Sequence, residues 1–224
     1  MKKLTVGKAI IVLAGLLAVV AAGWYATTAN RDQTASTDSM AGMDHGGAAQ
    51  PAQDTVADNL AKLTAEYSSL QGDEFDKKYV GDMIEHHKGA VDMANMALSK
   101  AKHTELQTMA GSIIESQSKE IETMTAWQKA WGYPAVMDEF MMDHSTMGMT
   151  DMDAAFKDKT GDDFDKTFLQ MMIEHHQGAV AMSRPAATNA KHDEVKQLAA
   201  EIIAAQEAEI AQMQQWLADW GYGQ

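Results

Sequence analysis

The sequence predicts an all-α protein in which two copies of a helical hairpin form a four-helix bundle. The first observation is an internal repeat: residues 72–133 align without a gap with residues 161–222, and 30 of 62 positions are identical. The second is the helical spacing of apolar residues in each copy. The third is a Gly near the end of each copy, Gly132 and Gly221, where a helix is expected to stop. Two such units bury their apolar faces against each other, so residues 56–133 and 161–224 are predicted to form one domain.

Composition restricts the kind of partner and the kind of metal site. The chain has 224 residues and a net charge of −14, which argues against nucleic acid as a partner because a phosphate backbone attracts a basic surface. It has no Cys, so disulfides and thiolate metal sites are excluded. Its 18 Met are far more than usual, and the Met thioether is both a core filler and a soft metal ligand.

Residues 1–30 are predicted to be an export signal or an N-terminal membrane anchor. Lys2, Lys3 and Lys8 precede an uncharged, mostly apolar run over residues 9–25. This run is longer than an ordinary signal core and shorter than an ordinary membrane span, so cleavage and retention both remain open. In either case the rest of the chain is expected outside the cytoplasm, which makes it periplasmic or otherwise extracytoplasmic.

The next segments are predicted to be a tether and then the first hairpin. Residues 31–55 are polar, small and without period, which is typical of a disordered tether, and they include a Met/His cluster at residues 40–45. A short helix is expected over residues 56–70. A long helix, capped by Asp73, should then run to about Lys100, and a second should run from about Thr104 to Gly132. In the second copy, Pro185 is expected to kink or end the corresponding long helix.

Residues 134–160 connect the hairpins and are rich in Met and His. No helical apolar stripe explains these residues, and polar residues and Gly148 lie between them. Core packing is therefore a poor explanation, and the segment is predicted to capture a soft metal. The candidate ligands in it are Met141, Met142, His144, Met147 and Met149.

A pair of adjacent His residues with Met on both sides is the most unusual motif, and it occurs once in each copy. The first copy reads Met-Ile-Glu-His-His over residues 83–87, and the second repeats it over residues 172–176. On a helical wheel, His86 and His87 flank the centre of the buried stripe, and Met83 lies one turn before both. Gln117 and Glu120 fall on the apolar face of the second helix, and an antiparallel hairpin brings Gln117 opposite His87 and Glu120 level with Met83, at the height of the His pair.

These residues are predicted to form a Cu(I) site inside the bundle. Thioether sulfur in place of carboxylate oxygen shifts metal preference from iron towards Cu(I), or towards Ag(I) as its mimic. The candidate ligands share the two His motifs or the facing polar and Met positions; they are Met83, His86, His87, Met93, Glu120, Met124, Met172, His175, His176, Met182, Glu209 and Met213.

Two other interpretations stay open. The His, Gln and Glu side chains can form a metal-free hydrogen-bond network that fixes the register of the helices, which would make the protein a structural or interaction bundle. Alternatively, Glu120 and Glu209 can serve a metal-dependent oxidase of the dimetal carboxylate type, although no Glu-x-x-His motif occurs in the chain.

The chain resembles DUF305, a ferritin-like family of unknown function. The resemblance rests on a Phe-Asp pair followed by Met-Ile-x-His-His-x-Gly-Ala-Val-x-Met, which occurs over residues 75–93 and 164–182, and on Gln-x-x-Glu-Ile-x-x-Met over residues 117–124 and 206–213. It implies a ferritin-like four-helix bundle that is exported. Its CopM-like periplasmic members are associated with copper binding and resistance. We therefore expect a copper-binding protein, more a binding protein than an enzyme, that sequesters the metal or passes it to a copper-transfer protein.

Overall fold

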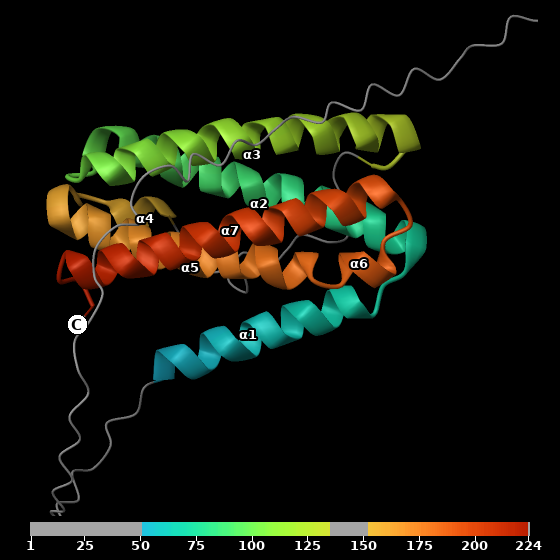
Figure 1. Cartoon of the computed structure of the whole chain (residues 1–224), viewed down its shortest axis with the longest axis horizontal. Coiled ribbons are helices and arrows are strands. Elements are labelled where there is room, and N and C mark those ends of the chain that lie inside the picture. The colour runs from blue at the N-terminus through green and yellow to red at the C-terminus, as the bar shows by residue number, and fades with distance from the viewer. Residues whose placement is uncertain (1–50, 135–151, 224) are drawn as a thin grey trace, which may run out of the picture. The chain divides into compact units, whose positions relative to one another are not determined.

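The computed structural model describes residues 51–134 and 152–223, and no strand occurs in these ranges. Its helices, labelled in Figure 1, are α1 (Pro51–Ser68), α2 (Gly72–Lys100), α3 (Thr104–Trp131), α4 (Met152–Phe156), α5 (Gly161–Ser183), α6 (Ala186–Asn189) and α7 (Asp193–Asp219). The prediction of an all-α protein is confirmed. The predicted signal or anchor, most of the predicted tether, and Met141, Met142, His144, Met147 and Met149 lie outside the described residues. Among the helices described, none has the length and apolarity needed to cross a membrane.

Four long helices form two antiparallel hairpins. Helix α3 packs along α2, α7 packs along α5, and the hairpins meet where α2 contacts α5 (Figure 1). The turn at residues 101–103 is as short as the sequence predicts. Helix α1 lies along α5 and begins at Pro51, earlier than the expected start at residue 56.

Helix ends follow the turn chemistry of the sequence at three sites and differ at one. Gly132 and Gly221 adopt left-handed φ angles of 70° and 75° after α3 and α7, which residues with a side chain rarely adopt. Helix α5 ends at Ser183, and Pro185 starts the short α6. Asp73 does not cap α2, because Gln71 occupies the cap position without a side-chain bond. Asp73 instead binds Tyr133 of its own repeat and Lys191 of the other, as described below.

The buried side chains separate into two cores that contain equivalent Met residues. The first core contains Met83, Met124 and Met182, and the second contains Met172, Met213 and Met93. Each Met of one set is the repeat counterpart of a Met of the other, and all six are at most 1% exposed. Each core therefore takes Met from both hairpins, which places a related set of three thioethers on either side of the centre.

Helix α1 closes the first core. Its Leu63 and Tyr67 are buried there, and the Tyr67 hydroxyl donates a hydrogen bond to Asp82 at 2.5 Å. Lys78 Nζ donates to the same carboxylate at 2.8 Å. In the second repeat the counterpart of Asp82 is Met171, so these buried hydrogen bonds to a carboxylate occur in the first repeat and not at the equivalent position of the second.

Candidate metal centre

The two His pairs lie inside the bundle, where α2 and α5 pack against each other. His86, His87, His175 and His176 are at most 1% exposed. The rings of His86 and His175 come from different helices and lie with centroids 3.6 Å apart at an interplanar angle of 41°. The two His motifs of the repeat therefore meet at one place, as the sequence predicts.

The outer His of each pair is bound to a carboxylate. His87 Nε2 lies 2.6 Å from Glu120 Oε2, and His176 Nε2 lies 2.7 Å from Glu209 Oε2. An ionised carboxylate only accepts hydrogen bonds, so this contact assigns the ring proton to Nε2 and leaves Nδ1 of the neutral ring with a free lone pair. Both Nδ1 atoms are buried without a hydrogen-bond partner. A carboxylate that orients a His for a metal on its other nitrogen has this arrangement.

The inner His rings have no hydrogen-bond partner at either nitrogen. Both ring nitrogens of His86 and of His175 are buried and unpaired, as is the Oε1 atom of Gln117 and of Gln206. Buried polar atoms are normally paired, so this group of unpaired atoms at the helix interface needs an explanation. A bound cation supplies one.

Burial keeps the inner rings neutral. It lowers the pKa of His86 and of His175 well below the ordinary value, and the neighbouring His residues lower both pKa values further. A neutral imidazole retains the lone pair that binds a metal. These rings are therefore in the ligand form at neutral pH.

The surrounding donor set is soft. Within residues 51–134 and 152–223, no three side chains of the His, Asp and Glu types are grouped so that they could hold one ion. The other donor groups buried inside the bundle include the six thioethers of the two cores. Imidazole nitrogen together with thioether sulfur suits Cu(I), and it does not suit metals that prefer carboxylate oxygen.

Gly178 provides space beside the inner His ring. A Cβ atom built on Gly178 would lie 3.3 Å from His86 Nε2, whereas one built on Gly111 in α3 would meet nothing within 4 Å. The glycine thus allows α5 to approach the unpaired nitrogen closely. A side chain there would displace the ring by a few tenths of an ångström.

The Gly178→Ala variant is expected to bind Ag(I) at least tenfold more weakly than the unchanged protein. Ala favours a helix over Gly by about 1 kcal/mol, so the loss of affinity should occur without a large loss of stability. Competition titration with Ag(I) beside thermal unfolding measures both quantities. The matched control is Gly111→Ala, which should add stability and leave affinity unchanged; equal affinities in the two variants would contradict this role for Gly178.

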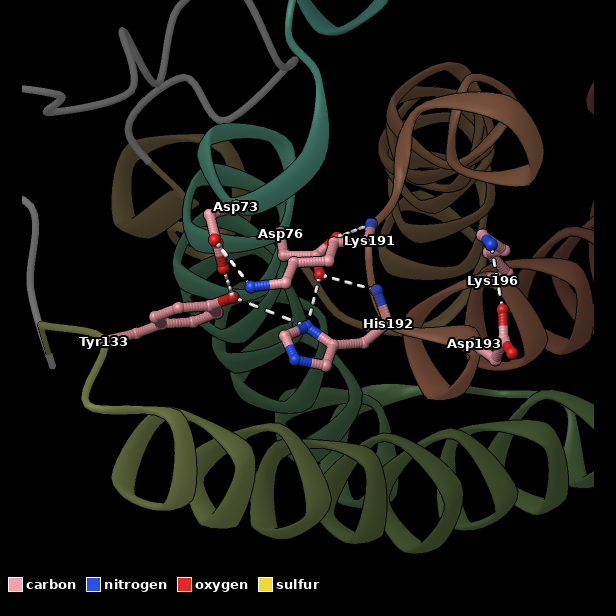
Figure 2. Close-up of polar contacts among 7 residues, drawn as sticks. All are labelled: Asp73, Asp76, Tyr133, Lys191, His192, Asp193 and Lys196. Atoms are coloured by element: carbon pink, nitrogen blue, oxygen red, sulfur yellow. Dashed lines mark hydrogen bonds and ion pairs between the residues drawn. The ribbon is translucent and has the colours of Figure 1, made fainter.

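Much of the repeated signature forms a polar cluster that the sequence did not reveal (Figure 2). The buried carboxylate of Asp76 accepts hydrogen bonds from the backbone N–H groups of Lys191 and His192 at 3.1 and 2.9 Å, and from His192 Nδ1 at 2.6 Å. Asp73 accepts from Tyr133 Oη at 2.8 Å and from Lys191 Nζ at 2.7 Å. The contacts with Lys191 and His192 join the start of α2 to the start of α7, so the first hairpin caps a helix of the second. The Tyr133 contact ties the start of α2 to the residues that follow α3.

The twin cluster repeats this arrangement in the opposite direction. Asp165 accepts from the backbone N–H groups of Lys102 and His103 at 2.9 and 3.1 Å, and from His103 Nδ1 at 2.6 Å. In each cluster the His ring also stacks on a Trp at 3.8 Å, His103 on Trp220 and His192 on Trp131. We call these two groups the cross-repeat clasps. They show that the repeated Phe-Asp, Lys-His and Trp-Gly-Tyr strings hold the two repeats together.

The structure buries most of the predicted ligands of the bundle and places the two predicted Glu ligands against the outer His rings. The four His and six Met are buried, and Glu120 and Glu209 contact the outer His rings from the partly exposed side, with side-chain exposures of 18% and 23%. The sequence places Gln117, and through the repeat Gln206, on the apolar face of a helix, but neither residue was predicted to be a ligand. Their unpaired oxygens are the signal that adds them to the site.

Comparison with known proteins identifies relatives of the same fold. The model of a domain of unknown function, DUF305, matches residues 76–217, and that of a second one, DUF4142, matches residues 21–124. No curated protein sequence matches the chain.

Solved structures similar to this one include metal-bound forms of CopM. CopM in the Cu(I)-bound form is 38% identical, with a TM-score of 0.55 over 65% of this chain and 96% of that one. For CopM in the Cu(II)-bound form the identity is also 38%, with a TM-score of 0.58 over 67% and 99%, and Ag-bound forms are similar as well. A candidate secreted DUF305 protein from Streptomyces coelicolor is 30% identical, with a TM-score of 0.59 over 65% of this chain and 92% of that one. Since the family model spans more than half of the chain, the chain belongs to the DUF305 family.

Proposed function

We propose that this protein binds Cu(I), and Ag(I) as its mimic, in the interior of its helical bundle, and that it works outside the cytoplasm to sequester copper or to pass it to a transfer protein. The observation that carries the proposal is the set of unpaired imidazole nitrogens on four buried His residues. CopM, a relative with Cu(I)-bound, Cu(II)-bound and Ag-bound structures, supports copper as the metal, and the soft donor groups favour Cu(I). The candidate secreted relative and the apolar start of the chain support export.

The proposed ligands have distinct roles. His86 and His175 offer nitrogen from the centre, and His87 and His176 offer Nδ1 from either side. Glu120 and Glu209 hold the outer rings in the required tautomer and are positioning residues in this proposal. The thioethers of the two cores complete the coordination with soft sulfur.

The test is an anaerobic Cu(I) titration of the purified protein against a competing chromophoric chelator. A variant with all four His changed to Asn is expected to lose at least a hundredfold in affinity. Because four buried substitutions can impair folding, a Met83→Leu/Met172→Leu variant is tested beside it, since Leu conserves the volume of Met. This second variant should stay folded and bind Cu(I) at least tenfold more weakly. Unchanged affinity in both folded variants would place copper elsewhere in the chain and refute the proposal.

A metal-dependent oxidase is the second candidate, and the carboxylates of Glu120 and Glu209 beside the His rings favour it. Such an enzyme would consume dioxygen when Cu(I) or Fe(II) is added. Stoichiometric metal binding without continued oxygen consumption distinguishes the binding protein from this oxidase.

A further inference from the structure

The methionines outside the two cores are distributed unevenly. Four partly exposed Met residues pack against the second core, namely Met96, Met109, Met152 and Met171. The partly buried apolar residues against the first core are Leu60, Leu70, Ile121, Trp127 and Trp131. Among the described residues, therefore, every Met that is not fully buried lies beside the second core, and none of these lies beside the first. We call these four residues the Met rim.

The repeat makes this asymmetry informative. The repeat equivalents of Met96, Met109 and Met171 are Pro185, Leu198 and Asp82, and the same offset of 89 residues, extended beyond the aligned range, pairs Met152 with Leu63. Leu63 and Leu198 are buried in the first core, and Asp82 is held by Tyr67 and Lys78. If Met were only a filler, its equivalents would be expected on both sides, because the buried Met residues are all repeated.

Met96 and Met109 lie where a path from the surface can begin. Helices α2 and α3 are antiparallel because only residues 101–103 join them, and His87 contacts Glu120 across the pair. Met96, nine residues after His87, and Met109, eleven residues before Glu120, therefore lie at the same end of the hairpin. Met96 is also three residues after the buried Met93, which makes the two side chains neighbours on α2. A partly exposed thioether thus adjoins a buried one.

Met152 and Met171 extend the rim on other helices. Lys100 Nζ donates to the backbone oxygen of Phe156 at 3.3 Å, which joins α4 to the end of α2. Phe156 is buried in the second core, and Met152 lies one turn before it. Met171 directly precedes the buried Met172 on α5.

We propose that the Met rim is the loading and unloading surface for a soft monovalent cation, Cu(I) or Ag(I), and that it serves the second core while the first core exchanges its metal slowly. This inference rests on the proposed function, because it assumes that both cores hold metal. Thioethers bind such cations without charge and without a fixed geometry, so successive Met residues provide a stepwise path. Among the described residues, no partly exposed Met packs against the first core, and Leu63 and Tyr67 of α1 are buried in it.

The test follows removal of Ag(I) from the fully loaded protein by an excess of a competing thiol. The unchanged protein should release metal from the bundle in a fast and a slow phase. A variant with all four rim residues changed to Leu, which conserves volume, should slow the fast phase at least tenfold and keep the amount of bound Ag(I) in the bundle. An unchanged fast phase in this variant, or a single phase in the unchanged protein, would overturn the proposal.

The matched control changes the first core instead. A Met83→Leu/Met124→Leu/Met182→Leu variant should lose the slow phase and retain the rate of the fast one. Spectra of methyl-labelled Met identify which thioethers hold Ag(I) before the thiol is added, and the Met residues outside the described ranges are identical in every variant. If the Met83 and Met172 methyl signals do not shift with Ag(I) in the unchanged protein, the proposed function itself fails, and this outcome is distinct from a failure of the rim.

Discussion

Replacing Asp76 by Ala is expected to lower the free energy of unfolding by about 3–5 kcal/mol. The Asp76 side chain is fully buried and accepts three hydrogen bonds from Lys191 and His192. Two of the donors are backbone N–H groups at the start of α7, which have no partner within the helix. Their loss, together with that of the His192 contact, leaves three donors near the interface unpaired.

Equilibrium unfolding in urea measures this effect, and the repeat provides an internal comparison. Asp165→Ala should lose a similar amount, because Asp165 has the same three contacts with Lys102 and His103. The matched control is Asp163→Ala, an exposed Asp in the first turn of α5, where only a weakened helix-dipole interaction of about 0.3–1 kcal/mol is expected. If Asp76→Ala loses no more than this control, the cross-repeat clasps do not hold the hairpins together.

The clasps mark the limit of what the sequence predicts about the fold. Periodicity, Gly132 and Pro185 predict the hairpins because these signals act within a few residues along the chain. Asp73 and Asp76 act on residues more than 55 positions away, just after α3 and in the second repeat. Asp73 was predicted to cap its own helix, which is the usual local role of an Asp at that position. The packing of α2 against the second hairpin gives it other partners.

The candidate site, like the fold, has features that the sequence predicts and features that depend on how the two hairpins pack. Hairpin register alone placed Gln117 opposite His87 and Glu120 level with Met83, one turn away, and in the structure Glu120 is the side chain that contacts His87. The contact between His86 and His175, and the presence of Met182 in the core of the first repeat, depend on how the two hairpins rotate against each other. No spacing within one helix contains that information. The uneven Met rim likewise required knowledge of which Met residues are buried.

The metal-free protein is expected to lose stability steeply as the pH falls below about 6.5, the ordinary pKa of His. Burial lowers the pKa of His86 and of His175 in the folded state. Above pH 6.5 both rings are neutral in the folded and in the unfolded chain, so stability is complete. Below it, the unfolded chain takes up protons at these positions and the folded protein does not. Each ring then costs about 1.4 kcal/mol per pH unit, about 2.7 for the pair, until the pH reaches the lowered pKa values.

Urea unfolding of the metal-free protein between pH 7 and pH 5 tests this, with a His86→Asn/His175→Asn variant for comparison. The groups that face these rings, His87, His176, Glu120 and Glu209, are unchanged in the variant, so the difference between the two slopes isolates the inner rings. The variant is expected to have a slope smaller by up to about 2.7 kcal/mol per pH unit. Equal slopes would show that the inner rings are protonated in the folded protein and are not preformed ligands.

A third curve, measured at a fixed excess of free Ag(I), links this titration to metal binding. Because burial already favours the neutral form of both inner rings in the folded protein, Ag(I) displaces few protons from them. Binding should therefore raise the curve by about 2.7 kcal/mol per site at a hundredfold excess over Kd, and the inner rings should add no change of slope. If the rings were protonated before binding, the stabilisation by Ag(I) would instead shrink as the pH falls. An offset between the curves that the His86→Asn/His175→Asn variant does not make more dependent on pH is thus the expected signature of inner rings that burial deprotonates before the metal arrives.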